Sequence, residues 1–264
     1  HSRGHLPFRE PFRTLLMQAI VKGRAYKLDG RYISAEEAAG NPNVQVSFEK
    51  MSKSKGTGIN PDVLVESINV LEERRVADES KNDKLLVEAN KAEIFEDSHS
   101  WTGGNASGDL TMVEFIDYRC GYCRKVAAEV DEVVAKDGNI KLILKEFPIL
   151  GQESELASRY AIAVKQMAGP EAYKTAHDKL YAMRGAVTLE SLGALAKEQG
   201  LDAQAITQRM NTEEVSAEIR ANRQLAEKMQ IMGTPTFVIG PELLRGIPST
   251  GLASAVEQIR AAQG

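Results

Sequence analysis

The chain has 264 residues, of which 42% are hydrophobic and 27% charged. This ordinary globular composition excludes collagen-like, low-complexity and wholly disordered chains, and the length suits one or two domains. No run of about 18 apolar residues occurs, so the sequence predicts no membrane-spanning helix. The net charge of -4 argues against a general nucleic-acid binder. It is unevenly divided: residues 1–58 carry net +5 and residues 59–264 net -9, which suggests two segments with different partners.

The first 58 residues contain one apolar patch, over residues 15–21, and are otherwise rich in Gly, Asn, Pro and Lys. Such a segment would bury little core, so we do not expect an independent domain. A helix is predicted over 61–95, starting at Pro61 and carrying apolar residues at roughly helical spacing. Its apolar stripe is thin and its middle is densely charged, which is typical of a helix that packs on another chain.

The rest of the chain alternates strand and helix signals. In chain order they are a loop at 98–109, a strand at 110–117, a helix at 125–136, a strand at 140–147, helices over 154–229 with breaks near 169–170, 185 and 200, strands at 236–239 and 242–245, and a helix at 249–262. This order predicts an α/β fold with an inserted helical block of about residues 152–229.

The two cysteines of the chain form a Cys-x-x-Cys motif, Cys120 and Cys123, where the strand at 110–117 meets the next helix. At a helix N-terminus the dipole and the free backbone N–H groups favour a thiolate, the attacking species in disulfide exchange. Cys120 is therefore the predicted nucleophile. Cys123, one turn along, is the predicted resolving thiol.

Two other interpretations of this motif stay open. A Cys-x-x-Cys can be half of a zinc site, but no other cysteine exists and the histidines lack ligand spacing, so no metal is expected. The pair could also be two buried cysteines that act as small hydrophobes.

Two further signals are associated with the motif. Thr234-Pro235 leads into a short apolar strand, which fits a cis peptide bond as well as an ordinary turn. Glu114 lies in an apolar strand six residues before Cys120, where it is either a buried proton relay for the thiols or an edge residue facing water. Asp117 is a weaker relay candidate, and Lys145 or Glu146 could pair with either acid.

Residues from about 60 to 264 closely resemble the DsbA-like, thioredoxin-fold thiol–disulfide oxidoreductases of bacteria. The resemblance rests on Val113–Cys123, on Lys145–Gly151 (Lys-Glu-Phe-Pro-Ile-Leu-Gly) and on Gly233–Gly240 (Gly-Thr-Pro-Thr-Phe-Val-Ile-Gly). It is strongest to the branch with a helical N-terminal extension, the Com-one and suppressor-of-copper-sensitivity type. It implies a thioredoxin fold with a helical insertion, preceded by a helical extension over 59–97.

The same resemblance implies the site and its setting. Cis-Pro235 would face the dithiol, Glu114 would match the family's buried acid, and Gly121, Tyr122 and Thr234 would contact substrate. The implied substrates are unfolded or misfolded secreted proteins, with a redox partner protein, no cofactor, and a homo-oligomer formed through residues 61–95 that would favour isomerisation. The implied location is periplasmic, although no secretion signal is found in the sequence. Gly121-Tyr122 replaces the Pro-His of the strongest oxidants, which leaves the redox potential open.

The N-terminal segment resembles a different family. Lys50–Ser54 (Lys-Met-Ser-Lys-Ser) looks like the KMSKS loop of class I aminoacyl-tRNA synthetases, and Glu10–Gln18 and Leu28–Ser34 resemble leucyl-tRNA synthetase. In that family the loop lysines stabilise phosphate charge during adenylate formation. Because neither a partner motif nor a nucleotide-binding domain is present, we expect a synthetase fragment joined to an oxidoreductase.

Three hypotheses follow from the sequence. The first is a protein disulfide oxidoreductase or isomerase that uses the Cys120–Cys123 dithiol. The second is an aminoacyl-tRNA-ligase-related fragment or fusion, supported by residues 1–58. The third is a non-catalytic helical binding or assembly protein built on residues 61–95.

Overall fold

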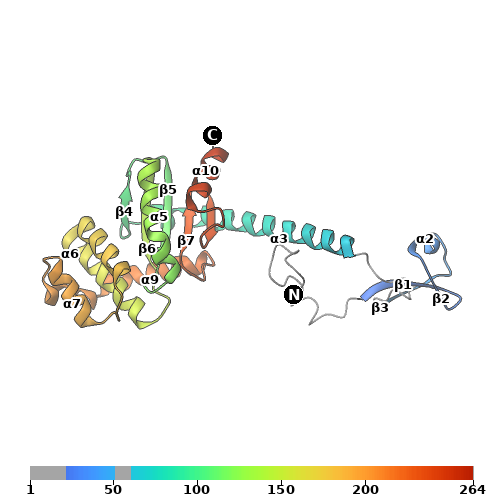
Figure 1. Ribbon diagram of the computed structural model, residues 1–264, viewed down its shortest axis with the longest axis horizontal. Coiled ribbons are helices and arrows are strands. Elements are labelled where there is room, and N and C mark those ends of the chain that lie inside the picture. The colour runs from blue at the N-terminus through green and yellow to red at the C-terminus, as the bar shows by residue number, and fades with distance from the viewer. Residues whose placement is uncertain (1–21, 51–60, 264) are drawn as a thin grey trace. The chain divides into compact units, whose positions relative to one another are not determined.

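A computed structural model describes residues 22–50 and 61–263 of the chain (Figure 1). The chain divides into two compact units between Val76 and Ala77, within the helix α3 (Pro61–Ala89). Each unit is described by itself. Within the described residues, no helix is both long and apolar enough to cross a membrane.

The first unit contains a three-stranded antiparallel sheet in the order β2-β1-β3. Its elements are β1 (Lys22–Leu28), β2 (Arg31–Ile33), the short helix α2 (Ala35–Ala38) and β3 (Gln45–Lys50). Asp29 and Gly30 join β1 to β2 and both have positive φ, as a two-residue type I′ hairpin turn requires. Among the side chains described here, Ala25 alone is buried. The KMSKS-like motif falls mostly outside the described residues.

The second unit is built on a five-stranded mixed sheet in the order β4-β6-β5-β7-β8. The central strands β5 (Leu110–Ile116) and β6 (Ile140–Glu146) are parallel, and all other neighbours are antiparallel. Together with β7 (Thr236–Ile239) and β8 (Glu242–Arg245), they confirm the predicted strands within one residue. The chain therefore has the expected thioredoxin-like α/β fold.

One strand was wrongly predicted as loop. Residues 101–104 form β4 (Trp101–Gly104), which pairs with β6 at the edge of the sheet. Its composition is that of a turn, but Trp101 anchors it, because the indole is buried and donates a hydrogen bond to the Pro170 carbonyl at 2.9 Å. A Cβ added to Gly103 would meet the Trp101 ring at 2.1 Å, so only glycine leaves room for this anchor.

The helices of this unit follow the predicted order. They are α4 (Lys91–Phe95), α5 (Gly121–Asp137), α6 (Gln152–Ala182), α7 (Leu189–Glu198), α8 (Ala203–Met210), α9 (Glu213–Lys228) and α10 (Leu252–Gln263). Helices α6 to α9 lie between β6 and β7 and form the helical insertion (Figure 1). Two bounds differ from expectation: α5 starts at Gly121 rather than 125, and the predicted helix over 61–95 is interrupted at Asn90, between α3 and α4.

The two faces of the sheet bury different clusters, because side chains alternate along each strand. Met112 and Leu144 point to the face covered by α5 and α6, whereas Phe115 and Ile143 point to the other face, where they pack with Ile94 of α4. By the same alternation, Glu114 and Glu146 belong to the α5–α6 face and Lys145 to the opposite face. The sheet thus separates Lys145 from Glu114.

Candidate active site

The dithiol lies at the junction predicted from the sequence. Cys120 is the N-cap residue of α5, and its sulfur accepts a hydrogen bond from the Cys123 backbone N–H at 3.4 Å. Both cysteines are free thiols. Cys120 is 6% exposed and Cys123 is fully buried. An attacking group from solvent can therefore reach Cys120 far more readily than Cys123.

The Thr234–Pro235 peptide bond is cis and precedes β7. The pairing of β7 with β5, with Phe115 opposite Thr236, brings this segment beside the dithiol. The Cys120 thiol donates to the Thr234 carbonyl, with sulfur and oxygen 3.2 Å apart. Two motifs more than a hundred residues apart in the sequence therefore meet at the nucleophile.

Glu114 is buried in the middle of β5, with 3% of its surface exposed. Burial raises the pKa of this carboxyl to about 8, and the charges of Asp131 and Cys120 add to the effect. Of the two interpretations left open by the sequence, the structure shows the buried one. A carboxyl with this pKa exchanges its proton near neutrality, as a proton relay requires.

Cys123 has a strongly raised pKa. Burial is the largest cause, and the charges of Glu114 and Cys120 raise the pKa further. The resolving thiol is therefore protonated at neutral pH, and its proton must leave before it can attack.

The carboxylate of Asp117 organises a loop of the fold, while the Asp117 backbone contacts the Cys123 thiol and opposes the rise in its pKa. Asp117 is buried and accepts hydrogen bonds from the backbone N–H groups of Ile149 and Leu150 at 2.8 and 3.0 Å, and from the Ser154 hydroxyl at 2.7 Å. It therefore organises the connection between β6 and α6.

Lys145 does not pair with Glu114 or Asp117, contrary to the pairing considered from the sequence. It lies on the opposite face of the sheet, where its ammonium group contacts Asp97 and donates to the Glu93 carbonyl at 3.0 Å. Burial lowers the pKa of Lys145, and the charge of Asp97 opposes this shift.

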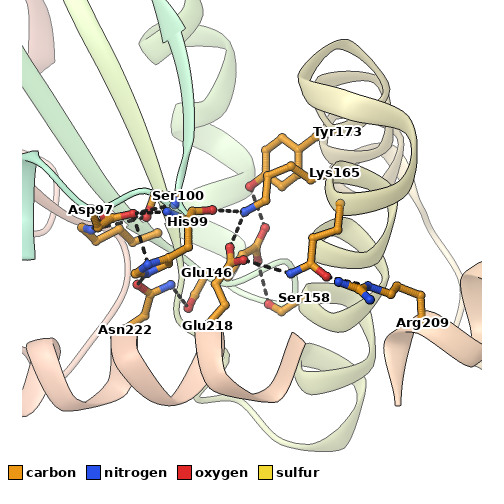
Figure 2. A network of polar contacts seen from close by, with 12 residues as sticks. Asp97, His99, Ser100, Glu146, Ser158, Lys165, Tyr173, Arg209, Glu218 and Asn222 are labelled. Atoms are coloured by element: carbon orange, nitrogen blue, oxygen red, sulfur yellow. Dashed lines mark hydrogen bonds and ion pairs between the residues drawn. The ribbon is translucent and has the colours of Figure 1, made fainter. Parts of the chain in front are cut away.

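Glu146 also pairs with neither acid. Its carboxylate accepts hydrogen bonds from Tyr118, Tyr173 and Ser158, as part of a polar network that Figure 2 shows from close by. The sequence contained one weak signal for this cluster, since a charged residue at the end of an apolar strand needs partners. It could not indicate that the partners come from α6.

Exposed apolar side chains occur beside both motifs of the site. Tyr122, between the two cysteines, is 66% exposed, and Met232, ahead of the cis bond, is 90% exposed. Ile149 and Leu150, held by Asp117, are exposed as well. Gly121 has no atom within 4 Å of where a Cβ would lie, so the space above the motif is open. Exposed apolar groups around a reactive centre are typical of a peptide-binding surface.

These features define a thioredoxin-like fold with a dithiol at the start of a helix. The family model described as DSBA-like thioredoxin domain matches residues 111–257, which is more than half of the chain. The chain belongs to this family, the DsbA-like thiol–disulfide oxidoreductases.

Two solved structures illustrate the likeness. A thioredoxin-like oxidoreductase from Silicibacter pomeroyi is 36% identical with a TM-score of 0.60, and the match covers 66% of this chain and 99% of that one. A periplasmic thioredoxin-like protein from Salmonella enterica serovar Typhimurium is 30% identical with a TM-score of 0.57, over 65% of this chain and 95% of that one.

A separate likeness covers another quarter of the chain. A leucine–tRNA ligase from Prochlorococcus marinus is 40% identical over 77 residues, which is 25% of this chain. The match spans only 9% of the ligase. The two resemblances seen in the sequence are therefore both confirmed, and the second concerns a small piece of a much larger enzyme.

Proposed function

We propose that the chain exchanges disulfides with protein substrates through Cys120 and Cys123. The observation that carries this proposal is the geometry of Cys120, a nearly buried thiol at the start of α5 with its sulfur 3.2 Å from the Thr234 carbonyl oxygen. No cofactor is needed for this chemistry, because the dithiol itself stores the two electrons.

The first step is attack by the Cys120 thiolate on a substrate disulfide. A bond forms between Cys120 and one substrate sulfur, the substrate S–S bond breaks, and the other substrate sulfur leaves as a thiolate that takes up a proton. The helix N-terminus favours the attacking thiolate, because backbone N–H groups and the helix dipole face it. The observed N–H of Cys123 supplies one such contact.

The second step releases the substrate. Cys123 transfers its proton to the ionised Glu114 carboxylate, attacks Cys120 and forms the Cys120–Cys123 disulfide, while the second substrate sulfur leaves as a thiolate. The burial of both groups supports this role for Glu114, because solvent cannot easily remove the Cys123 proton. Run in reverse, the same two steps oxidise a substrate dithiol.

The substrate in this proposal is an extended or unfolded polypeptide. Tyr122 and Met232 offer it exposed apolar area, Gly121 leaves room for its backbone, and Thr234 with Pro235 offers a strand-like edge. A periplasmic location and a redox partner protein belong to the same proposal, supported by the family and by the periplasmic relative from Salmonella.

The experiment for this proposal is insulin reduction in the presence of dithiothreitol. The intact protein should accelerate precipitation of the insulin B chain over the reductant alone. A rate equal to that of the reductant would contradict the proposed function. Refolding of a scrambled disulfide protein, run beside it, measures isomerase against oxidase activity.

We further propose that α3 mediates self-association, which would favour isomerisation. Leu71 is 64% exposed, and Val76 and Leu85 of the same helix are exposed as well. The side chains of Val63, Leu64 and Ile68, predicted to join this contact, lie outside those described. Leu71 and Leu85 are about four helical turns apart and share one face of α3, whereas Val76 lies on another face. A second copy of the same helix is the simplest partner for the face that carries Leu71 and Leu85.

Light scattering on the intact chain is expected to give a multiple of its 28.9 kDa mass. Leu71→Ala should weaken association about 30-fold for each copy, since burying a leucine contributes about 2 kcal/mol. Met167→Ala, at an exposed position on α6, is the matched control and should leave the mass unchanged. A monomer of the intact chain at micromolar concentration would refute self-association and, with it, the isomerase preference.

We expect that disulfide exchange does not require residues 1–58. A chain starting at Asn60 is expected to reduce insulin at a rate within about twofold of the intact protein, because the dithiol, Glu114 and the cis bond all lie in the second compact unit. Loss of exchange in a folded chain of this kind would show that the synthetase-like segment contributes to function. A tRNA-ligase activity is not supported, since the match covers 9% of such an enzyme.

A further inference from the structure

A second buried carboxylate lies on the same face of the sheet as Glu114 and has no role in the exchange steps. Glu146, the last residue of β6, accepts three hydroxyl hydrogen bonds, and Figure 2 labels two of the donors, Tyr173 and Ser158. Tyr118 and Tyr173 donate to Oε1 at 2.8 and 2.7 Å, and Ser158 donates to Oε2 at 2.7 Å. Tyr173 and Ser158 belong to α6, whereas Tyr118 lies two residues before Cys120. The carboxylate therefore joins the helical insertion to the segment that carries the nucleophile.

The hydroxyl of Tyr118 has one proton and two polar neighbours, Glu146 and the His177 Nδ1 atom at 3.1 Å. When Glu146 is ionised, Tyr118 donates to it and accepts from His177. When Glu146 is protonated, its proton must point at one of the three hydroxyls, and that hydroxyl must turn away. Tyr118 can turn to His177 Nδ1 when the ring carries its proton on Nε2. Tyr173 also hydrogen-bonds Tyr118, and Ser158 has no second side-chain partner among residues 22–50 and 61–263.

The groups around Glu146 set the pH at which its carboxyl group changes charge, and this pH is near neutral. Burial raises the pKa of Glu146 to about 7; the three hydroxyls oppose this effect, and the charge of Glu218 on α9 adds to it. Lys165 of α6 pairs with Glu218 and lies over the Tyr173 ring at 5.8 Å. His177 supplies no charge, because burial lowers its pKa to about 3.

The residue between Tyr118 and the nucleophile is tied to the same insertion. Arg119 donates to the Gly185 carbonyl at 3.2 Å and forms an ion pair with Glu153 of α6 at 3.3 Å. Both residues that precede Cys120 are therefore held by the helical insertion. The Arg119 contact is partly exposed, so the buried Tyr118 contact is the firmer of the two.

We infer that Glu146 is a positioning residue for Cys120 and acts through Tyr118. The ionised carboxylate holds the segment of Tyr118 to Cys120 against the helical insertion, and protonation releases this hold. The inference rests on the proposed function, in which Cys120 is the nucleophile.

The test is the rate of Cys120 alkylation by iodoacetamide, followed by mass spectrometry across the neutral pH range in the intact protein. The ratio of the wild-type alkylation rate to the rate of Tyr118→Phe or Glu146→Gln should change about fivefold as the pH rises through about 7. A factor of about five corresponds to the free energy of one ordinary hydrogen bond. Thr175→Ala is the matched control: it removes a hydroxyl at an exposed position on the same helix that does not bond Glu146, and its ratio should stay constant with pH.

The inference would be overturned if the ratio of wild-type to variant alkylation rates stayed constant with pH for both Tyr118→Phe and Glu146→Gln. If a variant fails to fold, the profile of Glu114→Gln still decides: with the Glu114 titration removed, it must show an inflection near pH 7 beyond that of a single thiol. A profile that one ionisation describes would overturn the inference. Failure of the wild type to exchange with glutathione would overturn the proposed function instead, so the two failures are distinguishable.

Discussion

Replacing Cys120 by serine is expected to abolish disulfide exchange, with a loss of at least about three orders of magnitude in rate. Every step of the exchange passes through the Cys120 sulfur, and a hydroxyl cannot form the mixed disulfide. Cys123 cannot take over as the attacking thiol, because it is fully buried and burial raises its pKa. Insulin reduction measures this loss.

Cys123→Ser is the matched variant, since it changes the same atom one helical turn away. It should still attack substrates but fail to release them, so mixed disulfides on Cys120 accumulate and appear on non-reducing gels. Unchanged insulin reduction by Cys120→Ser, or mixed disulfides that accumulate on Cys123 in that variant, would contradict the assignment of the nucleophile.

A second large effect is expected on the free energy of unfolding, which should depend on pH through the ionisation of Glu114. Its pKa is about 8 in the folded protein and 4.5 when unperturbed. Between these values the folded chain holds a proton that the unfolded chain releases, so the free energy of unfolding falls as the pH rises from 4.5 to about 8. The full fall is about 5 kcal/mol.

Glu114→Gln removes this titration. Urea unfolding should therefore show the variant gaining about 5 kcal/mol over wild type as the pH rises from below 4.5 to above 8. Release of mixed disulfides should become slower, because the Cys123 proton loses its acceptor. Glu132→Gln, at an exposed position on α5, is the control and should follow the wild-type pH dependence. A Glu114→Gln curve parallel to wild type would show that this carboxyl is ionised in the folded protein.

The parts of the site that could be predicted are those encoded locally. A Cys-x-x-Cys after an apolar strand places Cys120 at a helix N-terminus, and the N-cap contact with Cys123 follows from that spacing. The Thr234-Pro235 sequence alone fits either a cis bond or an ordinary turn. Pairing of β7 with β5 is what brings this segment beside the dithiol. The buried position of Glu114 depended on β5 lying between two strands, which a single strand pattern cannot show.

The parts that could not be predicted depend on contacts between distant elements. Trp101 holds β4 at the sheet edge through a hydrogen bond to the Pro170 carbonyl, and the sequence around residues 101–104 does not indicate this distant partner. Lys145 is adjacent to Glu146 in sequence but points to the opposite face, where Asp97 meets it. Two of the three partners of Glu146 come from α6 and the third is Tyr118, so its hydrogen bonds could not be inferred from spacing.

The most direct measurement of the central claim maps where glutathione reacts in the fully reduced, intact protein. After brief mixing with oxidised glutathione and an acid quench, peptide mass spectrometry should find glutathione on Cys120 first, and then a Cys120–Cys123 disulfide with the glutathione released. Glutathione found first on Cys123, or a failure of the internal disulfide to form, would contradict the account.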